Sequence, residues 1–106
     1  MQRPAYFDAY QTIVFDRTDD GILTIRFHSD DGPVVYASAH HNDWVNAFYA
    51  ISADRDNKVV IITGTGDEFI AVEKWDRPTD KVIHWDQIYW EGKRLLQHLL
   101  NIEVPV

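Results

Sequence analysis

The residues whose types and spacing first suggest chemistry lie at 57–69, in the stretch NKVVIITGTGDEF. An apolar run leads into a Gly-Thr-Gly turn, and phosphate-binding loops also follow a strand with a glycine-rich turn. However, no Lys-Ser or Lys-Thr pair comes next, and Phe69 stands where a dinucleotide fingerprint needs its third glycine. Asp67 and Glu68 would also repel a phosphate. We therefore interpret this segment as a strand followed by a structural turn.

Two polar clusters have the composition of metal sites. The stretch DRTDDG at 16–21 resembles the start of a calcium loop, but Phe27 occupies the twelfth position, where a bidentate acid is required. A hairpin turn is the favoured interpretation. In HHND at 40–43, His40 and His41 are adjacent, so on a helix their side chains would point about 100° apart and would not converge on one ion. We interpret this cluster as a polar helix start and expect no metal site.

The remaining polar side chains form no known catalytic arrangement. There is no G-x-S-x-G motif, the serines have no triad context, and no two acids form a glycosidase-type pair. We interpret His84 and His98 as solvated helix residues. If the chain is part of an enzyme, main-chain amides could be its catalytic groups, because they leave no side-chain motif.

Composition narrows the classes of function. The 106 residues fit at most one small domain, and 45% of them are apolar, as in a globular protein. The net charge of -7 disfavours nucleic acid and anionic membranes as partners. The absence of cysteine excludes disulfides, zinc–thiolate sites and thiol nucleophiles. No apolar run approaches the length of a membrane span, and the first ten residues do not resemble a signal peptide. We expect a cytoplasmic protein.

Alternating apolar and polar residues predict two strands near the amino terminus. The segments 10–18 and 21–29 each place apolar side chains on one face, and Asp-Asp-Gly at 19–21 supplies a tight hairpin turn. The Asp-Asp-Gly-Pro stretch at 30–33 ends the second strand. The short apolar segment 34–38 is either a third strand or an extended arm.

Helical spacing begins at about residue 41 and continues to 53, with Ser38 and Asn42 as candidate caps. Residues 54–57, DRDN, should break this helix. The apolar residues that share its predicted inner face are Trp44, Ala47, Phe48 and Ile51.

The second half of the chain has a strand followed by a helix. The run KVVIIT at 58–63 has no polar alternation, which is typical of a parallel strand buried on both faces. Spacing of three and four residues predicts an amphipathic helix over 85–100, and 102–106 should begin a new strand. This order is that of an α/β protein. Because the sequence stops inside the last strand, we expect an incomplete domain. The apolar face of the helix comprises Trp85, Ile88, Tyr89, Gly92, Leu95, Leu96 and Leu99.

The segment 57–69 also resembles the first core strand of the crotonase (enoyl-CoA hydratase/isomerase) superfamily. The segment 10–29 is similar to the opening hairpin of that fold, and 91–106 is similar to its next helix and strand. Residues 34–48 and 84–100 resemble the β-diketone hydrolase branch, typified by 6-oxocamphor hydrolase. The resemblance implies a crotonase-like ββα spiral, of which residues 1–106 would be the N-terminal half.

The resemblance also implies an oxyanion hole, in which main-chain N–H groups hold an enolate oxygen. The family pattern F-x-A-G-x-D corresponds to residues 69–74, in which Phe69 and Ala71 match. The resemblance implies that the main-chain N–H of Glu73 donates to the oxyanion and that Ala71 is a substrate-binding position. Val72 replaces the glycine and Lys74 replaces the aspartate. The bulkier residue at 72 is expected to hinder the close approach of a thioester. The alternative is that Glu73 belongs to a plain surface loop.

In the β-diketone hydrolase branch an aromatic side chain with a polar hydrogen holds a substrate carbonyl. The resemblance places Tyr36 at that position, where its hydroxyl could donate as an indole N–H does. The alternative is that Tyr36 is a core aromatic residue in a short strand.

The function implied by the resemblance is hydrolysis of a carbon–carbon bond in a cyclic β-diketone, a small-molecule carbonyl substrate, without cofactor or metal. The water-activating histidine–acid pair of that branch would lie beyond residue 106. One alternative is an enoyl-CoA hydratase or isomerase acting on acyl thioesters. Another is a catalytically silent half-domain that self-associates. Complete family members form homo-oligomers, commonly trimers or hexamers, so we expect association of this chain as well.

Overall fold

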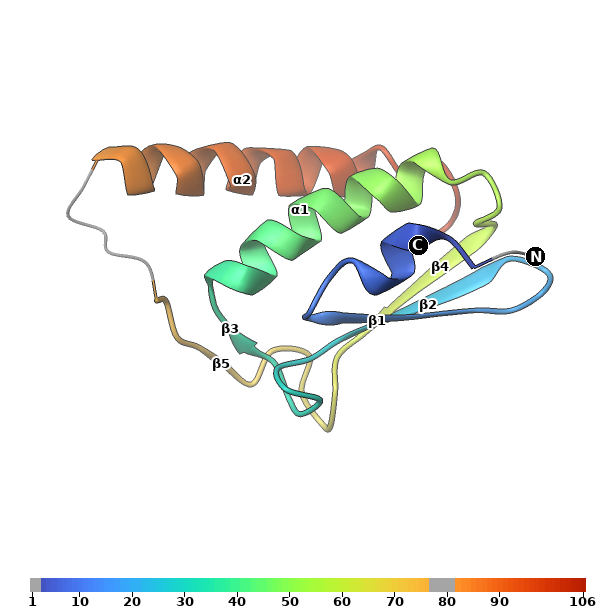
Figure 1. The fold of residues 1–106 in the computed structure, drawn as a ribbon, viewed down its shortest axis with the longest axis horizontal. Helices are drawn as coiled ribbons and strands as arrows, with labels where there is room; N and C mark the ends of the chain where they lie inside the picture. Colours follow the sequence, from blue (N-terminus) through green and yellow to red (C-terminus); the bar gives the residue numbers. More distant parts are fainter. Residues whose placement is uncertain (1–2, 77–81) are drawn as a thin grey trace.

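The computed structural model describes residues 3–76 and 82–106, and Figure 1 shows their arrangement. The first elements are the 3-10 helix η1 (Ala5–Asp8), strand β1 (Ile13–Arg17), strand β2 (Ile22–Phe27) and strand β3 (Val35–Tyr36). They are followed by helix α1 (Ser38–Ala53), strand β4 (Val59–Thr63), strand β5 (Val72–Glu73) and helix α2 (Val82–Leu100).

The predicted hairpin is confirmed. Strands β1 and β2 pair antiparallel, from Ile13 opposite Phe27 to Arg17 opposite Leu23. Gly21 ends the turn with φ +93°, a conformation that favours glycine. The apolar side chains alternate into the core as the sequence pattern predicts.

Strand β4 pairs in parallel with β2, in register from Ile22 opposite Val59 to Arg26 opposite Thr63, which gives the sheet order β1-β2-β4. A parallel neighbour requires a crossover, and α1 provides it over one face of the sheet (Figure 1). The predicted inner face of α1 is buried, as expected: Trp44, Ala47, Phe48 and Ile51 all belong to the core.

Burial of β4 on both faces, which its apolar run predicted, is wrong for this structure. Val60 is buried, but Ile61 is 48% exposed. On β1, at the other edge of the same sheet, Val14 is 41% exposed. The reason is that α1 and α2 both lie on the opposite side of the sheet (Figure 1), so one apolar face stays open to solvent.

Helix α1 begins at Ser38, three residues before the predicted start, and neither Ser38 nor Asn42 caps it. Instead, the Asp76 carboxylate accepts a hydrogen bond from the Ser38 N–H at 3.0 Å. His40 Nδ1 accepts another from the Ala37 N–H at 3.3 Å. The sequence could not show the first contact, because it joins residues far apart in the chain.

Residues 54–57 end α1 as predicted, and a buried polar network holds this end of the helix. Asp54 Oδ2 accepts hydrogen bonds from Arg17 and from the Tyr6 hydroxyl, both at 2.8 Å. Asn57 accepts from Arg17 and donates to the Ile51 carbonyl. Arg17 is almost fully buried, so these bonds satisfy a charge that would be costly to leave unpaired.

Helix α2 packs along α1, but only part of its predicted apolar face is used. Leu95 and Leu99 pack against the core, whereas Tyr89 and Leu96 are 76% and 60% exposed. His98 is not solvated as predicted, because its Nδ1 lies 2.8 Å from the Val45 carbonyl oxygen. Among the described residues no helix combines the length and apolarity that crossing a membrane would need.

The strand predicted at 102–106 is not formed. Ile102 is buried, and the Pro105 carbonyl accepts a hydrogen bond from the Val60 N–H at 2.9 Å. The segment therefore lies beside β4 without a ladder.

The hairpin turn yields a first prediction. A Cβ on Gly21 would lie 2.7 Å from the Asp56 carbonyl oxygen, in addition to the unfavourable φ. We expect Gly21→Ala to lower the free energy of unfolding by about 2 kcal/mol, measured by urea denaturation. Gly32→Ala is the matched control, since the nearest atom to its Cβ would be 3.5 Å away. Equal stability of the two variants would contradict the prediction.

The network at the end of α1 yields a second prediction. Burial raises the pKa of Asp54, but hydrogen bonds from Arg17, Tyr6 and the Asp56 N–H outweigh it, so this pKa lies below its ordinary value. Stabilisation is therefore complete above the unfolded aspartate pKa of about 4, and is lost as the pH falls through the folded value. Asp54→Asn should lower the free energy of unfolding at neutral pH. It should also make this free energy fall less steeply as the pH drops below about 4, which urea denaturation across this pH range would measure. Asp16→Asn is the matched control, because it removes a carboxylate from the exposed face of β1 and none of the hydrogen bonds of this network.

Candidate functional site

The sheet brings the two predicted site segments together. Since β2 and β4 are parallel, their carboxyl ends meet at one edge, and the segments that leave them pair as β3 and β5. Val35 lies opposite Val72, and Tyr36 lies opposite Glu73. The Lys74 N–H donates to the Tyr36 carbonyl at 2.8 Å, which fixes this register. Two of the predicted site residues, Tyr36 and Glu73, are therefore direct neighbours across a parallel pair.

The glycine-rich segment before β5 has the geometry of a structural turn. A Cβ on Gly64 would lie 2.8 Å from the Phe69 carbonyl oxygen, so only glycine allows the chain to fold back so closely. The Thr65 hydroxyl donates to the Phe27 carbonyl at 2.9 Å and accepts from Arg26 at 2.7 Å. These contacts attach the turn to the end of β2 and set the starting point of the 69–74 segment.

The Glu73 amide is not used in the pairing of β5 with β3. In a parallel pair, N–H groups of alternate residues point to the same side. The Val72 and Lys74 N–H groups both point to β3, where they donate to the carbonyls of Val34 and Tyr36. The Glu73 N–H must therefore point away from β3. Glu73 is exposed in the structure.

Ala71 has a different environment. Its N–H donates to the Val34 carbonyl at 2.9 Å, so this amide is already used by the fold. Its side chain borders a hollow of about 250 Å³ that Pro33, Asp67 and Glu68 also line. A role for Ala71 in binding would come through this hollow and stays a prediction.

Tyr36 lies half-buried among aromatic side chains. Its ring centroid is 5.2 Å from that of Trp44, 6.0 Å from His40 and 6.3 Å from His41. The core-aromatic interpretation and the binding interpretation are both compatible with this position, which is at the edge of the core beside β5.

His40 is buried and has a structural role that also excludes one kind of chemistry. Its Nδ1 accepts from the Ala37 N–H, so the proton of the neutral ring must be on Nε2. Nε2 lies 3.0 Å from both the His28 carbonyl and the Ser29 hydroxyl. A protonated Nε2 cannot remove a proton from the Ser29 hydroxyl. His40 therefore does not activate Ser29 as a nucleophile.

The structure adds a buried polar cluster that the sequence interpretation missed. Glu91 of α2 is 2% exposed, and its two carboxylate oxygens lie 2.9 Å from His41 Nδ1 and 2.7 Å from the Asn42 amide nitrogen. Because a carboxylate only accepts, it places the His41 proton on Nδ1. Trp75 packs edge-on against His41, at 5.6 Å between centroids. The partners are far apart in sequence, so only the packing of α2 on α1 reveals them.

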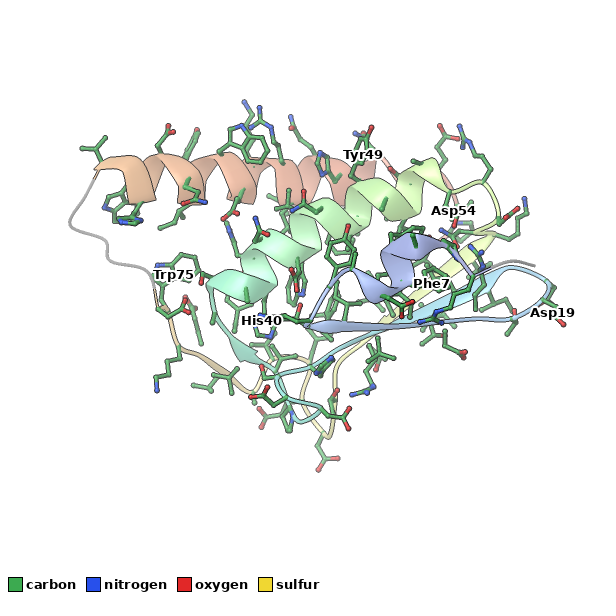
Figure 2. All side chains as sticks on the ribbon, viewed as in Figure 1. Phe7, Asp19, His40, Tyr49, Asp54 and Trp75 are labelled. Atoms are coloured by element: carbon green, nitrogen blue, oxygen red, sulfur yellow. The ribbon has the colours of Figure 1, made fainter. Side chains whose placement is uncertain are left out.

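Figure 2 shows where these groups lie: His40 and Trp75 are at the amino-terminal end of α1, whereas Phe7 and Asp54 are at its other end. Tyr36, His41 and the β3–β5 pair share the first location. Within residues 3–76 and 82–106, no group of three or more His, Asp or Glu side chains could hold a metal ion.

Comparison with solved structures places this arrangement among known folds. The chain is 44% identical to ABDH, a β-diketone hydrolase from the cyanobacterium Anabaena sp. PCC 7120 whose structure contains (S)-3-oxocyclohexyl acetic acid. The match has a TM-score of 0.89 and covers 100% of this chain and 43% of that chain.

Two enoyl-CoA hydratases share the fold at low identity. The protein from Shewanella pealeana ATCC 700345 has a TM-score of 0.78 and 12% identity over 94% of this chain and 39% of its own. The protein from Mycobacterium smegmatis has a TM-score of 0.73 and 15% identity over 90% of this chain and 38% of its own.

The chain thus spans about two fifths of the length of these proteins. No family model and no curated protein sequence matches it. Its elements follow those of the N-terminal part of these structures, and the likeness to ABDH extends over every residue. The chain belongs to the crotonase superfamily and has the N-terminal part of its α/β fold.

Proposed function

We propose that the chain is part of an enzyme that hydrolyses a carbon–carbon bond of cyclic β-diketones. The observation that carries this proposal is the 44% identity to a β-diketone hydrolase over the full chain. The keto acid bound by that relative is the type of product that such a reaction gives. Since the chain spans 43% of that protein, the activity of the whole enzyme is part of the proposal.

The reaction needs a water molecule and a place for negative charge. The oxygen of water adds to one carbonyl carbon, and the bond between this carbon and the central carbon breaks. The electron pair of that bond forms an enolate on the second carbonyl. A proton then reaches the central carbon, which yields a keto acid. The step that the protein must favour is therefore the accumulation of charge on the second carbonyl oxygen.

In this proposal the Glu73 N–H donates to that oxygen, and the Tyr36 hydroxyl donates beside it. Support comes from the β3–β5 register, which sets the two residues side by side, and from the direction of the Glu73 amide, away from β3. No water-activating residue of this chain is assigned. The proposal requires no cofactor.

The alternative is hydration or isomerisation of an enoyl thioester, as the names of the more distant relatives suggest. The sequence identities to the two enoyl-CoA hydratases, 12% and 15%, indicate a shared fold only. In addition, Val72 and Lys74 differ from the glycine and aspartate of the thioester-binding pattern. The diketone is therefore the preferred substrate class, and an acyl-CoA is the competing one.

The Glu73 amide gives the test. Glu73→Pro removes the N–H, which the β3–β5 ladder does not use, and Glu73→Ala keeps it. We expect the proline variant to bind cyclohexane-1,3-dione about tenfold more weakly, and the alanine variant to bind as the parent does, by calorimetric titration. A crotonyl thioester titrated in parallel should bind more weakly than the diketone. Unchanged diketone affinity in Glu73→Pro, or preference for the thioester, would contradict the proposal.

A second proposal concerns self-association, and one observation favours it. Along α2, five large apolar residues are between 56% and 85% exposed and recur at spacings that align them on one stripe of the helix. Such a stripe is unusual on the surface of a monomer. The chain would then form homo-oligomers through α2. The stripe consists of Val82, Trp85, Tyr89, Leu96 and Leu100.

Sedimentation velocity tests this second proposal. We expect the 106-residue chain to sediment as an oligomer. The double variant Leu96→Glu/Leu100→Glu should sediment more as a monomer, because association would bury two carboxylates in the interface. Gln97→Glu adds a charge at an exposed polar position of the same helix and should not change the distribution. A monomeric parent chain at high concentration would rule out association through this stripe.

A further inference from the structure

Trp44 carries a buried hydrogen-bond donor that the fold leaves unused. The residue is 7% exposed, and its indole Nε1 has no hydrogen-bond partner among the described residues. An unpaired buried N–H costs about 1–3 kcal/mol, and phenylalanine would fill much of the same space without this cost. The position of this donor therefore needs an explanation.

Among the described residues, none of the rings around Trp44 accepts a hydrogen bond from its indole N–H. Its ring stacks on Phe27 at 4.2 Å between centroids and meets Tyr36 edge-on at 5.2 Å and Phe69 at 6.4 Å. The His40 ring lies at 6.3 Å, but its Nδ1 accepts from the Ala37 N–H and its Nε2 carries the proton. His40 therefore cannot accept from the indole.

The surroundings of Trp44 are those of the candidate site. Tyr36 belongs to β3, and Phe69 begins the segment that leads to Glu73. Phe69 is 49% exposed, and its ring centroid lies 5.9 Å from that of Phe27 and 6.4 Å from that of Trp44, so it is the solvent-exposed ring beside this aromatic cluster. A ligand that displaces this ring would meet the Trp44 indole within a wall of aromatic side chains.

We propose that the Trp44 indole N–H donates a hydrogen bond to a neutral carbonyl oxygen of the bound ligand, and that it selects cyclic ketones. An apolar ring with a carbonyl group suits this environment, because the ring packs on the aromatic wall and the oxygen pairs with the unused donor. The inference deepens the proposed function and rests on it. It adds a donor from α1 to those that β3 and β5 provide.

Indole resonances give a direct test on the whole chain. In a ¹H–¹⁵N spectrum each of the four tryptophans contributes one indole signal, and Trp44→Phe identifies its signal by loss. On titration with cyclohexane-1,3-dione, we expect the Trp44 signal to move downfield, as a new hydrogen bond requires. Trp44→Phe should weaken the affinity about fivefold to tenfold. The smaller ring should lower its thermal midpoint because buried contacts are lost, and dispersed amide signals in the same spectrum would show that the variant is folded.

Trp90→Phe is the matched control, because this tryptophan is 48% exposed on α2 and is stacked by Arg94. The Trp90 indole signal should not move during the titration. Trp90→Phe should bind the diketone with the affinity of the parent. If the diketone moves the amides of residues 69–74 but not the Trp44 indole, the inference fails while the proposed function stands. If Trp44 responds and Glu73→Pro binds normally, the inference stands and the oxyanion assignment fails. If the diketone moves no signal, both fail.

Discussion

The parallel pairing of β2 with β4 is the constraint on which the rest of the structure depends. Two parallel strands cannot be joined by a tight turn, so the chain between them must cross over one face of the sheet, and α1 is that crossover. The same pairing makes both strands end at one edge. The segments that follow, 28–36 and 64–73, then leave the sheet side by side. Tyr36 and Glu73 come from distant parts of the sequence but meet because of this topology.

The strand conformation of residues 72–73 accounts for the altered family motif. Where a glycine precedes the donor amide, the backbone itself can approach the ligand. Here Val72 is paired with Val35, its N–H is 3.4 Å from the Val34 carbonyl, and its side chain is largely in solvent, with the residue 53% exposed. A β-branched residue suits a strand. The substitution that we expected to hinder a ligand thus also serves the pairing that directs the Glu73 amide away from β3.

Local patterns in the sequence predicted the elements well, because their causes are local. The alternation of apolar and polar residues predicted the two strands of the hairpin, and Asp-Asp-Gly at 19–21 predicted the turn between them. Helical spacing of apolar residues identified the buried face of α1. The failures have non-local causes. The cap from Asp76 and the contact between His98 and Val45 depend on packing between distant segments. In the same way, the apolar run of β4 suggested two covered faces, whereas the arrangement of the helices decides that Ile61 is exposed.

In the candidate site, too, the residues that depend on local sequence could be predicted and those that depend on packing between distant segments could not. Tyr36, Ala71 and Glu73 could be named because a family pattern passes through them, and a pattern is read along the chain. The Glu91 carboxylate and its partners could not be named in this way, since adjacent histidines beside an aspartate equally predict a polar helix start. The partnership arises only when α2 lies against α1, and no periodicity of either helix indicates which polar residue will face which.

That buried carboxylate also explains how α2 finds a single position on α1. The apolar surface of α2 extends well beyond the part that α1 covers, so leucine contacts alone would tolerate rotation or sliding of the helix. Glu91 removes this freedom. Any shift that separates it from His41 and Asn42 would leave a charge buried without partners, which costs several kcal/mol, whereas the apolar contacts would change little. The polar contact therefore sets the register of the two helices and holds His41 beside Tyr36 and Trp75.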